Sequence, residues 1–352
     1  MFSKVYFLPW IKISKLYNFL KTTGIFGQIK ARSFLAIKIH FGEDGNMGHI
    51  SPAYISPLVK IIKEKAAYPF LTDASTIYVG ERSDAYHHLL IANKHGFTIE
   101  KCGCPVIIAD GLRGSSEEKV EVNLKYFKTI SVAKEIHDAD SCIFLSHVKG
   151  HGIVGFGGAL KNIGMGCGSK AGKYAMHHSS KPNMDTERCI GCGNCVNYCY
   201  QKALSIINAK IVMNKEKCAG CGQCVVNCPL KVFGLKWNED SLTVQEKMVE
   251  YAAGILKTKK SSYISYINFL NNISKYCDCV SLSCNKAIMK DVGVVTGTDP
   301  VAVDQASYDL INKVFGGNFF KAIYPEINST VQLEYAEKLG LGSRKYELIY
   351  YQ

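Results

Sequence analysis

The chain carries one cysteine pattern twice, as CIGCGNCVNYC at residues 189–199 and CAGCGQCVVNC at residues 218–228. In each copy the spacing is Cys-x2-Cys-x2-Cys-x3-Cys, and glycines between the first three cysteines let backbone N–H groups face the sulfurs. Three thiolates of one run can hold three corners of an iron–sulfur cube, and the fourth ligand then comes from the other run. The pattern therefore predicts two 4Fe–4S clusters, the first on Cys189, Cys192, Cys195 and Cys228 and the second on Cys218, Cys221, Cys224 and Cys199.

Zinc is the competing interpretation of these cysteines. A zinc ion takes four ligands, however, and has no use for a third cysteine and a trailing fourth in each run. The segment 183–236 is similar to bacterial two-cluster ferredoxins, except that Tyr200 stands where a proline usually follows the first run. This resemblance implies a small inserted α+β module that transfers single electrons, with a purely structural cluster pair as the alternative.

The composition is that of an ordinary globular protein. Of 352 residues, 47% are hydrophobic and 20% are charged, which excludes a disordered, collagen-like or coiled-coil chain and suggests two domains. No apolar run approaches the roughly 18 residues that cross a bilayer. Lys12 and Lys15 interrupt the apolar start, so we expect no signal peptide and a cytoplasmic location. Fifteen cysteines, an odd number, argue against a disulfide framework.

The formal net charge of +12 raises the question of a nucleic-acid partner. The lysines are scattered, however, and the one tight run is Lys257, Lys259 and Lys260. No arginine-rich stripe accompanies it, so we expect a solvated lysine-rich surface that binds neither nucleic acid nor a membrane.

The rest of the chain predicts an α/β fold with a largely parallel sheet and flanking helices, because apolar β-branched runs alternate with helical patterns. The expected strands are 34–39, 69–72, 105–109, 141–146, 263–268 and 291–295, and the expected helices are 52–67, 83–96, 131–138, 244–256, 300–314 and 331–339. Pro52 and Pro300 suit a first helical turn, and Asp299 suits an N-cap. The α/β domain then comprises residues 1–182 and 237–352, interrupted by the ferredoxin-like module at 183–236.

Several predicted strands run directly into loops with polar side chains. These loops hold His40, Asp73, Asp110, His147 with His151, and the segment 296–299. In open parallel sheets, ligands bind in the crevice beyond the carboxyl ends of the strands, so the loops predict one shared pocket.

The richest of these loops spans residues 146–169. Its glycines let the backbone approach an anion, and its lysines supply positive charge. The candidate cofactor-binding residues are Lys149, Gly155, Gly157 and Gly158 of this loop, together with His40 and Asp299 of two other loops. The candidate catalytic residues are His147, His151 and Lys161; the alternative is that the histidines only hydrogen-bond the loop. His87, His88, His177 and His178 are expected in solvent or loops.

Two further cysteine pairs have a Cys-x-Cys spacing. Cys277 and Cys279 flank Asp278 and are a candidate third metal site, because such a pair can hold a soft metal or form a strained redox disulfide. Cys102 and Cys104 form the second pair.

Longer motifs carry a family resemblance. The chain resembles the uncharacterised iron–sulfur-centre proteins grouped as domain of unknown function 362, in the strings IKIHFGEDGN, LTDASTIYVGERSDAYHHL, IIADGLRG, SHVKGHGIVGFGGALKNIGMG, CDC and GTDPVAVDQAS. That resemblance implies a cytoplasmic redox protein of anaerobes with no assigned substrate. GFGGALKN is also similar to the glycine–lysine loop of nickel-pincer lactate racemases, which implies a small-carboxylate or organometallic pocket contacted by Lys161, His147 and His151.

Together these features predict an iron–sulfur oxidoreductase. Electrons would pass between an external donor or acceptor protein and a small anionic substrate or cofactor in the crevice, through the two clusters. The alternatives are a non-enzymatic ferredoxin-like carrier or redox sensor, and a metal or cluster chaperone. No nucleotide-binding fingerprint, of the Walker or the dinucleotide type, occurs in the sequence.

Overall fold

A computed structural model describes residues 2–78, 80–178, 182–199, 201–218, 222–234, 239–259, 262–280 and 286–352. Its centre is an eight-stranded sheet in the order β16-β1-β15-β14-β7-β2-β3-β4. The strands are β1 (Ser3–Pro9), β2 (Phe34–Lys38), β3 (Tyr68–Asp73), β4 (Val106–Ile108), β7 (Ser141–His147), β14 (Ile264–Leu270), β15 (Gly293–Gly297) and β16 (Tyr346–Tyr350).

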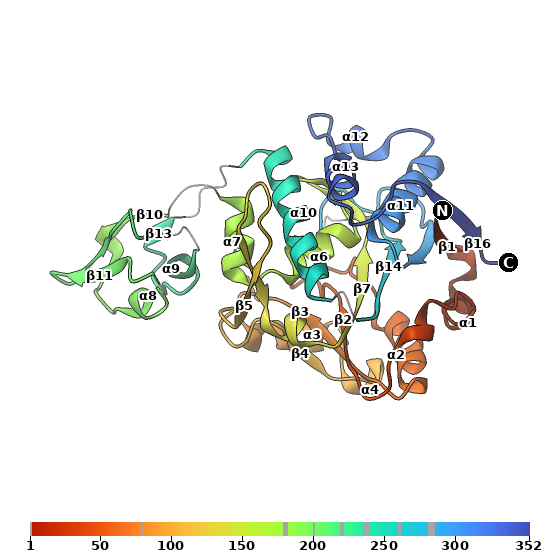
Figure 1. The fold of residues 1–352 in the computed structure, drawn as a ribbon, viewed down its shortest axis with the longest axis horizontal. Coiled ribbons are helices and arrows are strands. Elements are labelled where there is room, and N and C mark those ends of the chain that lie inside the picture. The colour runs from red at the N-terminus through yellow and green to blue at the C-terminus, as the bar shows by residue number, and fades with distance from the viewer. Residues whose placement is uncertain are drawn as a thin grey trace.

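Most neighbours in this sheet are parallel. The run β14-β7-β2-β3-β4 is parallel throughout, as is the edge pair β16-β1, whereas β15 is antiparallel to both β14 and β1. The predicted α/β class with a largely parallel sheet is therefore confirmed (Figure 1).

Helices cover both faces of the sheet (Figure 1). They are α1 (Leu16–Thr22), α2 (Ile55–Glu64), α3 (Ala85–Lys94), α4 (Ile99–Cys102), α5 (Lys134–Asp138), α6 (Ala159–Cys167), α7 (Lys170–His177), α10 (Ser241–Thr258), α11 (Pro300–Phe315), α12 (Phe319–Ile323) and α13 (Val331–Lys338). Strand β7 shows the division: Phe144 belongs to the core that includes α6, α10 and α11, and Ile143 to the core that includes α1 and α2. This alternation follows from the two-residue period of a strand.

Short ribbons complete the α/β part. β5 (Glu117–Glu121) pairs with β6 (Thr129–Ala133), and β8 (Lys149–His151) pairs with β9 (Gly155–Gly157). All six strands expected of the sheet are present, and five of the six expected helices are too, with ends shifted by a few residues. The helix expected at 131–138 is wrong in its first half, because the β-branched residues Ile130 and Val132 are buried in β6 and the helix begins at Lys134.

The residues expected at helix starts, Pro52, Asp299 and Pro300, lie at helix starts in the structure. Asp299 caps α11, where its carboxylate accepts hydrogen bonds from the backbone N–H groups of Val301 and Ala302 at 2.9 Å, and Pro300 is the first helical residue. Pro52 begins a 3-10 helix, Pro52–Tyr54, that leads into α2.

The segment with both cysteine runs forms a lobe beside α7 (Figure 1). Its described elements are β10 (Asn183–Met184), α8 (Asn194–Asn197), β11 (Leu204–Ile207), β12 (Lys210–Met213), α9 (Gln223–Val226) and β13 (Phe233–Gly234). Tyr174 of α7 packs into the small apolar core of this lobe. The contact is close: a Cβ added to Gly222, whose φ is +73°, would lie 2.3 Å from Cγ of Tyr174. The lobe therefore rests against α7.

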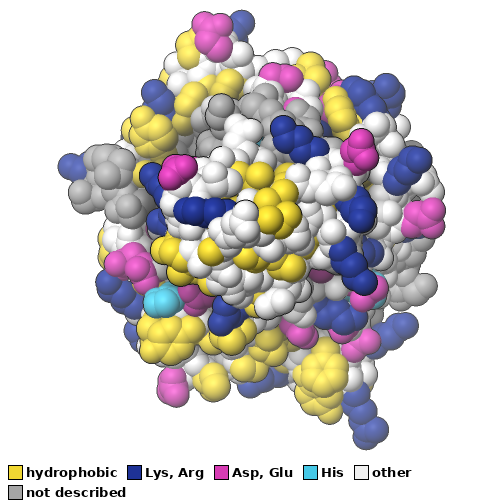
Figure 2. Space-filling view, turned by 90° about the vertical axis from the view of Figure 1, so that its left-hand side faces the viewer, with side chains coloured by type: hydrophobic (Ala, Val, Ile, Leu, Met, Phe, Trp, Pro, Cys, Tyr) yellow, Lys and Arg dark blue, Asp and Glu magenta, His cyan; other side chains and the backbone are white. Residues whose placement is uncertain are grey.

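Charged side chains of both signs are interspersed on the surface, as the scattered lysines of the sequence predict. On the face shown in Figure 2, Lys and Arg side chains alternate with Asp and Glu around an apolar centre. No helix in the described ranges has the length and apolar character needed to span a membrane.

Candidate functional site

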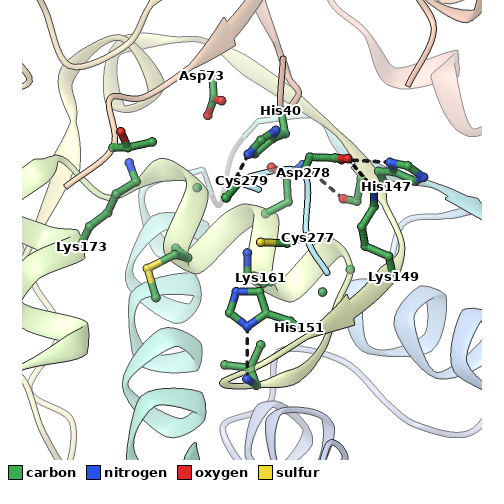
Figure 3. A pocket seen from close by; sticks show the side chains of 18 of the residues that line it. His40, Asp73, His147, Lys149, His151, Lys161, Lys173, Cys277, Asp278 and Cys279 are labelled. Atoms are coloured by element: carbon green, nitrogen blue, oxygen red, sulfur yellow. Dashed lines mark hydrogen bonds and ion pairs between the residues drawn. The ribbon is translucent and has the colours of Figure 1, made fainter. Parts of the chain in front are cut away.

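A cavity of about 200 Å³ lies beyond the carboxyl ends of β2, β3 and β7, between these strands, α6, α7 and the segment 277–279 (Figure 3). Most of the residues predicted for the crevice line it, namely His40, His147, Lys149, His151, Gly157, Gly158 and Lys161, and so do Cys277 and Cys279 of the candidate third metal site. Segments separated by more than 200 positions in the sequence thus meet in one pocket, as the loop argument predicted.

Asp110 lies outside the cavity lining, where its buried carboxylate accepts from Ser75, and two of the predicted cofactor-binding residues also lie elsewhere. Asp299 follows β15, which is antiparallel to β14, so this strand ends at the opposite edge of the sheet and Asp299 serves as the cap of α11. Gly155 has a φ of +77° and packs against Ser329, whose Cβ would lie 2.3 Å from an added Cβ. Both residues therefore have structural roles, and neither lines the cavity.

Asp278 anchors the segment Cys277–Cys279 at the cavity. Its buried carboxylate pairs with the Lys149 ammonium and with Nδ1 of His147, the latter at 2.9 Å. Burial favours the neutral acid, but Lys149 and His147 outweigh it and hold the pKa of Asp278 well below its usual range. The backbone also contributes, since the Asp278 carbonyl accepts from the Glu43 N–H at 3.0 Å.

His147 is fully engaged in this anchor. Its Nδ1 faces the Asp278 carboxylate, and its Nε2 lies 2.6 Å from the carbonyl oxygen of Asn271. Each ring nitrogen thus already faces a partner within the fold, and neither is left for a substrate. His147 therefore lines the cavity as a positioning residue, and the expectation that it moves protons is not supported by this geometry.

His40 faces the sulfur of Cys279, with Nε2 and Sγ 3.3 Å apart. The backbone N–H of Gly42 donates to Nδ1 of His40 at 3.0 Å, so Nδ1 carries no proton and the proton on Nε2 points at the sulfur. Hydrogen bonding from Cys277, together with His40 and Arg82, holds the pKa of Cys279 well below the usual thiol value despite burial. The same hydrogen bond, with burial, raises the pKa of Cys277.

Arg82 and Tyr78 are cavity residues that the sequence analysis did not identify. Arg82 is 1% exposed, its guanidinium bonds Asp73, Glu43 and the Tyr78 hydroxyl, and it is one of the charges acting on Cys279. Asp73 is also paired with Lys38 at 2.8 Å. No spacing rule marks a buried arginine, so the only signal was its place in the family-like string LTDASTIYVGERSDAYHHL.

Lys161 and Lys173 both line the cavity; Lys173 donates to the Gly168 carbonyl at 2.6 Å, which leaves Lys161 as a positive charge available to a ligand. The two acids that line the cavity, Asp73 and Asp278, are paired with other cations, whereas Lys161 lies beside His151 and Cys277 (Figure 3). Burial and the Lys161 charge hold the pKa of His151 well below its usual value. Nδ1 of the neutral His151 ring accepts from the Ile153 and Val154 N–H groups, so its Nε2–H is the donor.

Other residues depart from their expected surroundings. His177 lines the cavity and burial lowers its pKa to about 3, while His88 is completely buried next to Asp73 and has a pKa of about 4. The prediction of solvent or loop positions is wrong for both, because α3 and α7 turn these side chains inward. Burial raises the pKa of Cys102 to about 11 and of Cys104 to about 12.

A second, smaller cavity lies within the lobe. It is lined by the four cysteines predicted for the first cluster, Cys189, Cys192, Cys195 and Cys228, together with apolar side chains. Backbone N–H groups point at two of these sulfurs, from Gly191 to Cys189 and from Val232 to Cys228, both at 3.4 Å. Four cysteines thus line one apolar space, and two of their sulfurs accept backbone N–H groups.

The described cysteines of the second predicted cluster also line one cavity. Cys199, Cys218 and Cys224 line another cavity of the lobe, and Cys221 lies outside the described residues. The N–H of Ala203 points at the Cys199 sulfur at 3.3 Å. Over the described ranges, no three His, Cys, Asp or Glu side chains converge as ligands of a single metal ion, at the Cys277 and Cys279 pair or elsewhere.

Helix α7 connects the lobe with the crevice cavity. Tyr174 packs in the lobe core that contains Cys195 and Cys224, and Lys173 and His177 of the same helix line the crevice cavity. A further groove connects the crevice cavity with the lobe, because it is lined by Tyr78, which also lines the crevice cavity, and by Cys228 of the lobe.

The fold and site define an α/β protein with a charged thiol-containing crevice and an inserted cysteine-rich lobe. The chain belongs to the family described as domain of unknown function (DUF362), whose model matches residues 35–309. No curated protein matches the sequence.

Two solved structures share part of the fold. The lactate racemase apoprotein from Thermoanaerobacterium thermosaccharolyticum is 11% identical, with a TM-score of 0.47 over 88% of this chain and 57% of that one. A protein from Thermotoga maritima is also 11% identical, with a TM-score of 0.41 over 93% of this chain and 59% of that one. The chain thus spans under two thirds of the length of either.

Proposed function

We propose that the chain is an iron–sulfur oxidoreductase that moves electrons between an external protein and an anionic substrate bound in the crevice cavity. The observation that carries this proposal is that each predicted set of cluster cysteines borders one cavity of the lobe, as far as the residues are described. The two 4Fe–4S clusters, held by Cys189, Cys192, Cys195 and Cys228 and by Cys218, Cys221, Cys224 and Cys199, would supply one-electron transfer.

The position of the lobe supports delivery of electrons to the crevice. Because α7 packs Tyr174 into the lobe core and directs His177 to the cavity, one rigid element links the two sites. Tyr78 provides a second connection, since it borders both the groove that reaches Cys228 and the crevice cavity.

The charges of the cavity favour an anion. Asp73 and Asp278 are neutralised by Lys38, Arg82 and Lys149. Lys161 is therefore left to bind a carboxylate or similar group, with the neutral His151 Nε2–H as a second donor. Lys149 was predicted to bind the anion too, but its pairing with Asp278 makes it a supporting residue.

The external partner would dock on the lobe. Ile190 and Leu230 border the cysteine-lined cavity and are 68% and 40% exposed, so an apolar patch surrounds the approach to that site. The lobe faces the viewer in Figure 2, where apolar side chains occupy the centre of the face. Docking here would bring a partner's redox group close to the cysteines.

Iron and acid-labile sulfide per chain test the proposal, on protein purified without oxygen. We expect eight of each, with two interacting paramagnetic centres after reduction by dithionite. Cys195→Ser and Cys224→Ser should each lose about half of the iron, whereas Cys142→Ser, at a buried strand position outside the lobe, should lose none.

Fewer than four iron atoms in fresh wild-type protein would refute the assignment of both clusters. The oxidoreductase part is tested by reoxidation of the reduced protein with anionic substrates. Eight iron atoms with reoxidation that does not change in Lys161→Ala would leave an electron carrier and remove the crevice from the mechanism.

A further inference from the structure

We propose that Cys277 and Cys279 are a redox-active dithiol, and that the Cys279 sulfur attacks a small anionic disulfide bound beside Lys161. The inference deepens the proposed function and rests on it for the source of electrons. It names the group that receives them and the class of substrate that the crevice reduces.

The first support is the geometry of the Cys277–Val280 turn. The Val280 N–H donates to the Cys277 carbonyl at 3.2 Å, which folds the segment back so that the two cysteine side chains hydrogen-bond each other. Asp278, between them, is pinned to Lys149 and His147 on β8 and β7. The Val280 carbonyl accepts from the Asn46 side chain at 3.0 Å. Both sulfurs are thus held at the cavity wall.

The second support is the asymmetry of the two thiols. Cys279 receives a hydrogen bond from His40 at 3.3 Å and lies in the field of Arg82, so it is the thiolate and the nucleophile. Cys277 keeps its proton, which suits the thiol that attacks second and closes the disulfide. One activated and one protonated sulfur within reach of each other is the arrangement that thiol–disulfide exchange needs.

The third support is the charge opposite the sulfurs. Lys161 lines the same cavity and lies beside Cys277, so it is close to the place where a substrate disulfide would meet Cys279. The cavity of about 200 Å³ admits a small molecule and excludes a folded protein. The substrate class is therefore a low-molecular-weight disulfide with a carboxylate or comparable anionic group.

The exchange balances in two steps. The Cys279 thiolate bonds to one sulfur of the substrate, its S–S bond breaks, and the first thiolate leaves and takes up a proton. Cys277 then loses its proton to the second leaving thiolate and bonds to Cys279, giving the Cys277–Cys279 disulfide. Two electrons and one proton restore the thiol and thiolate, so the net reaction is one disulfide plus two electrons and two protons giving two thiols.

Cys102 and Cys104 provide a matched control, because they have the same spacing and are buried, and burial raises the pKa of both. The reduced full-length protein is mixed without oxygen with dithiodiglycolate, a dianionic disulfide, then alkylated and analysed by peptide mass spectrometry. We expect a Cys277–Cys279 disulfide, with Cys102 and Cys104 alkylated as free thiols. Cys277→Ser should trap a mixed disulfide on Cys279, and Cys279→Ser should trap none.

Charge selectivity tests the role of Lys161. Dithiodiglycolate should oxidise the pair at least about tenfold faster than cystamine, a dicationic disulfide, with neutral hydroxyethyl disulfide between them. Lys161→Ala should remove most of that ratio, chiefly through a lower rate with dithiodiglycolate. Equal rates for all three disulfides in wild-type protein would overturn the substrate class.

The dithiol itself fails if Cys277→Ser traps no adduct, or if Cys102 and Cys104 oxidise as fast as Cys277 and Cys279. These readouts do not depend on iron. Normal dithiol chemistry in a chain with fewer than four iron atoms would therefore remove the proposed electron source alone. Eight iron atoms with an unreactive Cys279 would remove the dithiol and keep the iron–sulfur proposal.

Discussion

The ion pair beneath the Cys277–Cys279 segment is open to a quantitative test. Asp278→Asn removes the carboxylate that neutralises Lys149 and accepts from His147, and leaves a shape that differs little. Lys149 is 2% exposed and Asp278 is 5% exposed, so water cannot replace the lost partner. The variant should therefore lose stability and loosen the segment that carries both sulfurs.

The size of the effect follows from burial. Removing one partner of a buried ion pair costs about 3–5 kcal/mol, because the other charge stays desolvated and unpaired. At about 2.1 cal/mol/K per residue, a 352-residue chain has an unfolding entropy of about 0.7 kcal/mol/K, so Asp278→Asn should lower Tm by about 4–7 °C. Thermal unfolding followed by circular dichroism, without oxygen, measures this shift.

A double-mutant cycle separates the ion pair from a general packing defect. Lys149→Met should be destabilising in the same range, since it leaves the Asp278 charge with His147 alone. The double variant Asp278→Asn with Lys149→Met should cost less than the sum of the single variants by at least about 1 kcal/mol, because it removes both charges of the Asp278–Lys149 pair together. Additive losses within about 0.5 kcal/mol would refute the account of Asp278 as a charge anchor.

Two further predictions concern other parts of the chain. Burial raises the pKa of Asp304 to about 6, so its protonation stabilises the fold at low pH, and this contribution disappears as pH rises from about 4 to about 6. Between pH 4 and 7 the unfolding free energy of wild type should fall by an amount of order 3 kcal/mol more than that of Asp304→Asn, and equal pH dependence would contradict it. Gly222→Ala should destabilise the docked lobe more than Gly193→Ala, because both glycines have φ near +73° but only Gly222 meets Tyr174. Hydrogen exchange in α7 measures the difference, and equal protection in the two variants would argue against docking through Tyr174.

Sequence patterns predicted those features that depend only on residues close together in the chain. The apolar runs predicted the strands of the sheet, and Asp299 with Pro300 predicted the start of α11, because a cap depends on neighbours within one turn. The error at 131–138 arose because the pairing of β6 with the preceding strand β5 was not recognised, so its β-branched residues were assigned to the helix that follows. The edge strand β16 and its neighbour β1, which pair across almost the whole chain, were likewise not expected.

The sequence predicted some residues of the candidate site, and only the structure identified the others. Sequence reasoning brought His40, His147, His151 and Lys161 to one crevice, because parallel strands end at a common edge, whereas the structure added Cys277 and Cys279. Sequence reasoning placed Asp299 there as well, since a sequence does not state that β15 runs antiparallel to its neighbours. Arg82 and the inward-facing His88 and His177 carried no local signal, because burial of a polar side chain depends on partners elsewhere.

The sequence by itself determined the α/β class, the repeated cysteine spacing and the list of chemically capable residues, because period, spacing and residue type are properties of short segments. Only the tertiary structure decided which of those residues act on one another. It turned His147 and Lys149 into an anchor for Asp278, set His40 and Arg82 against Cys279, and left Lys161 facing the cavity. These roles depend on charges and donors brought within a few ångströms by folding, and Coulomb and hydrogen-bond energies depend on distance and burial rather than on sequence separation.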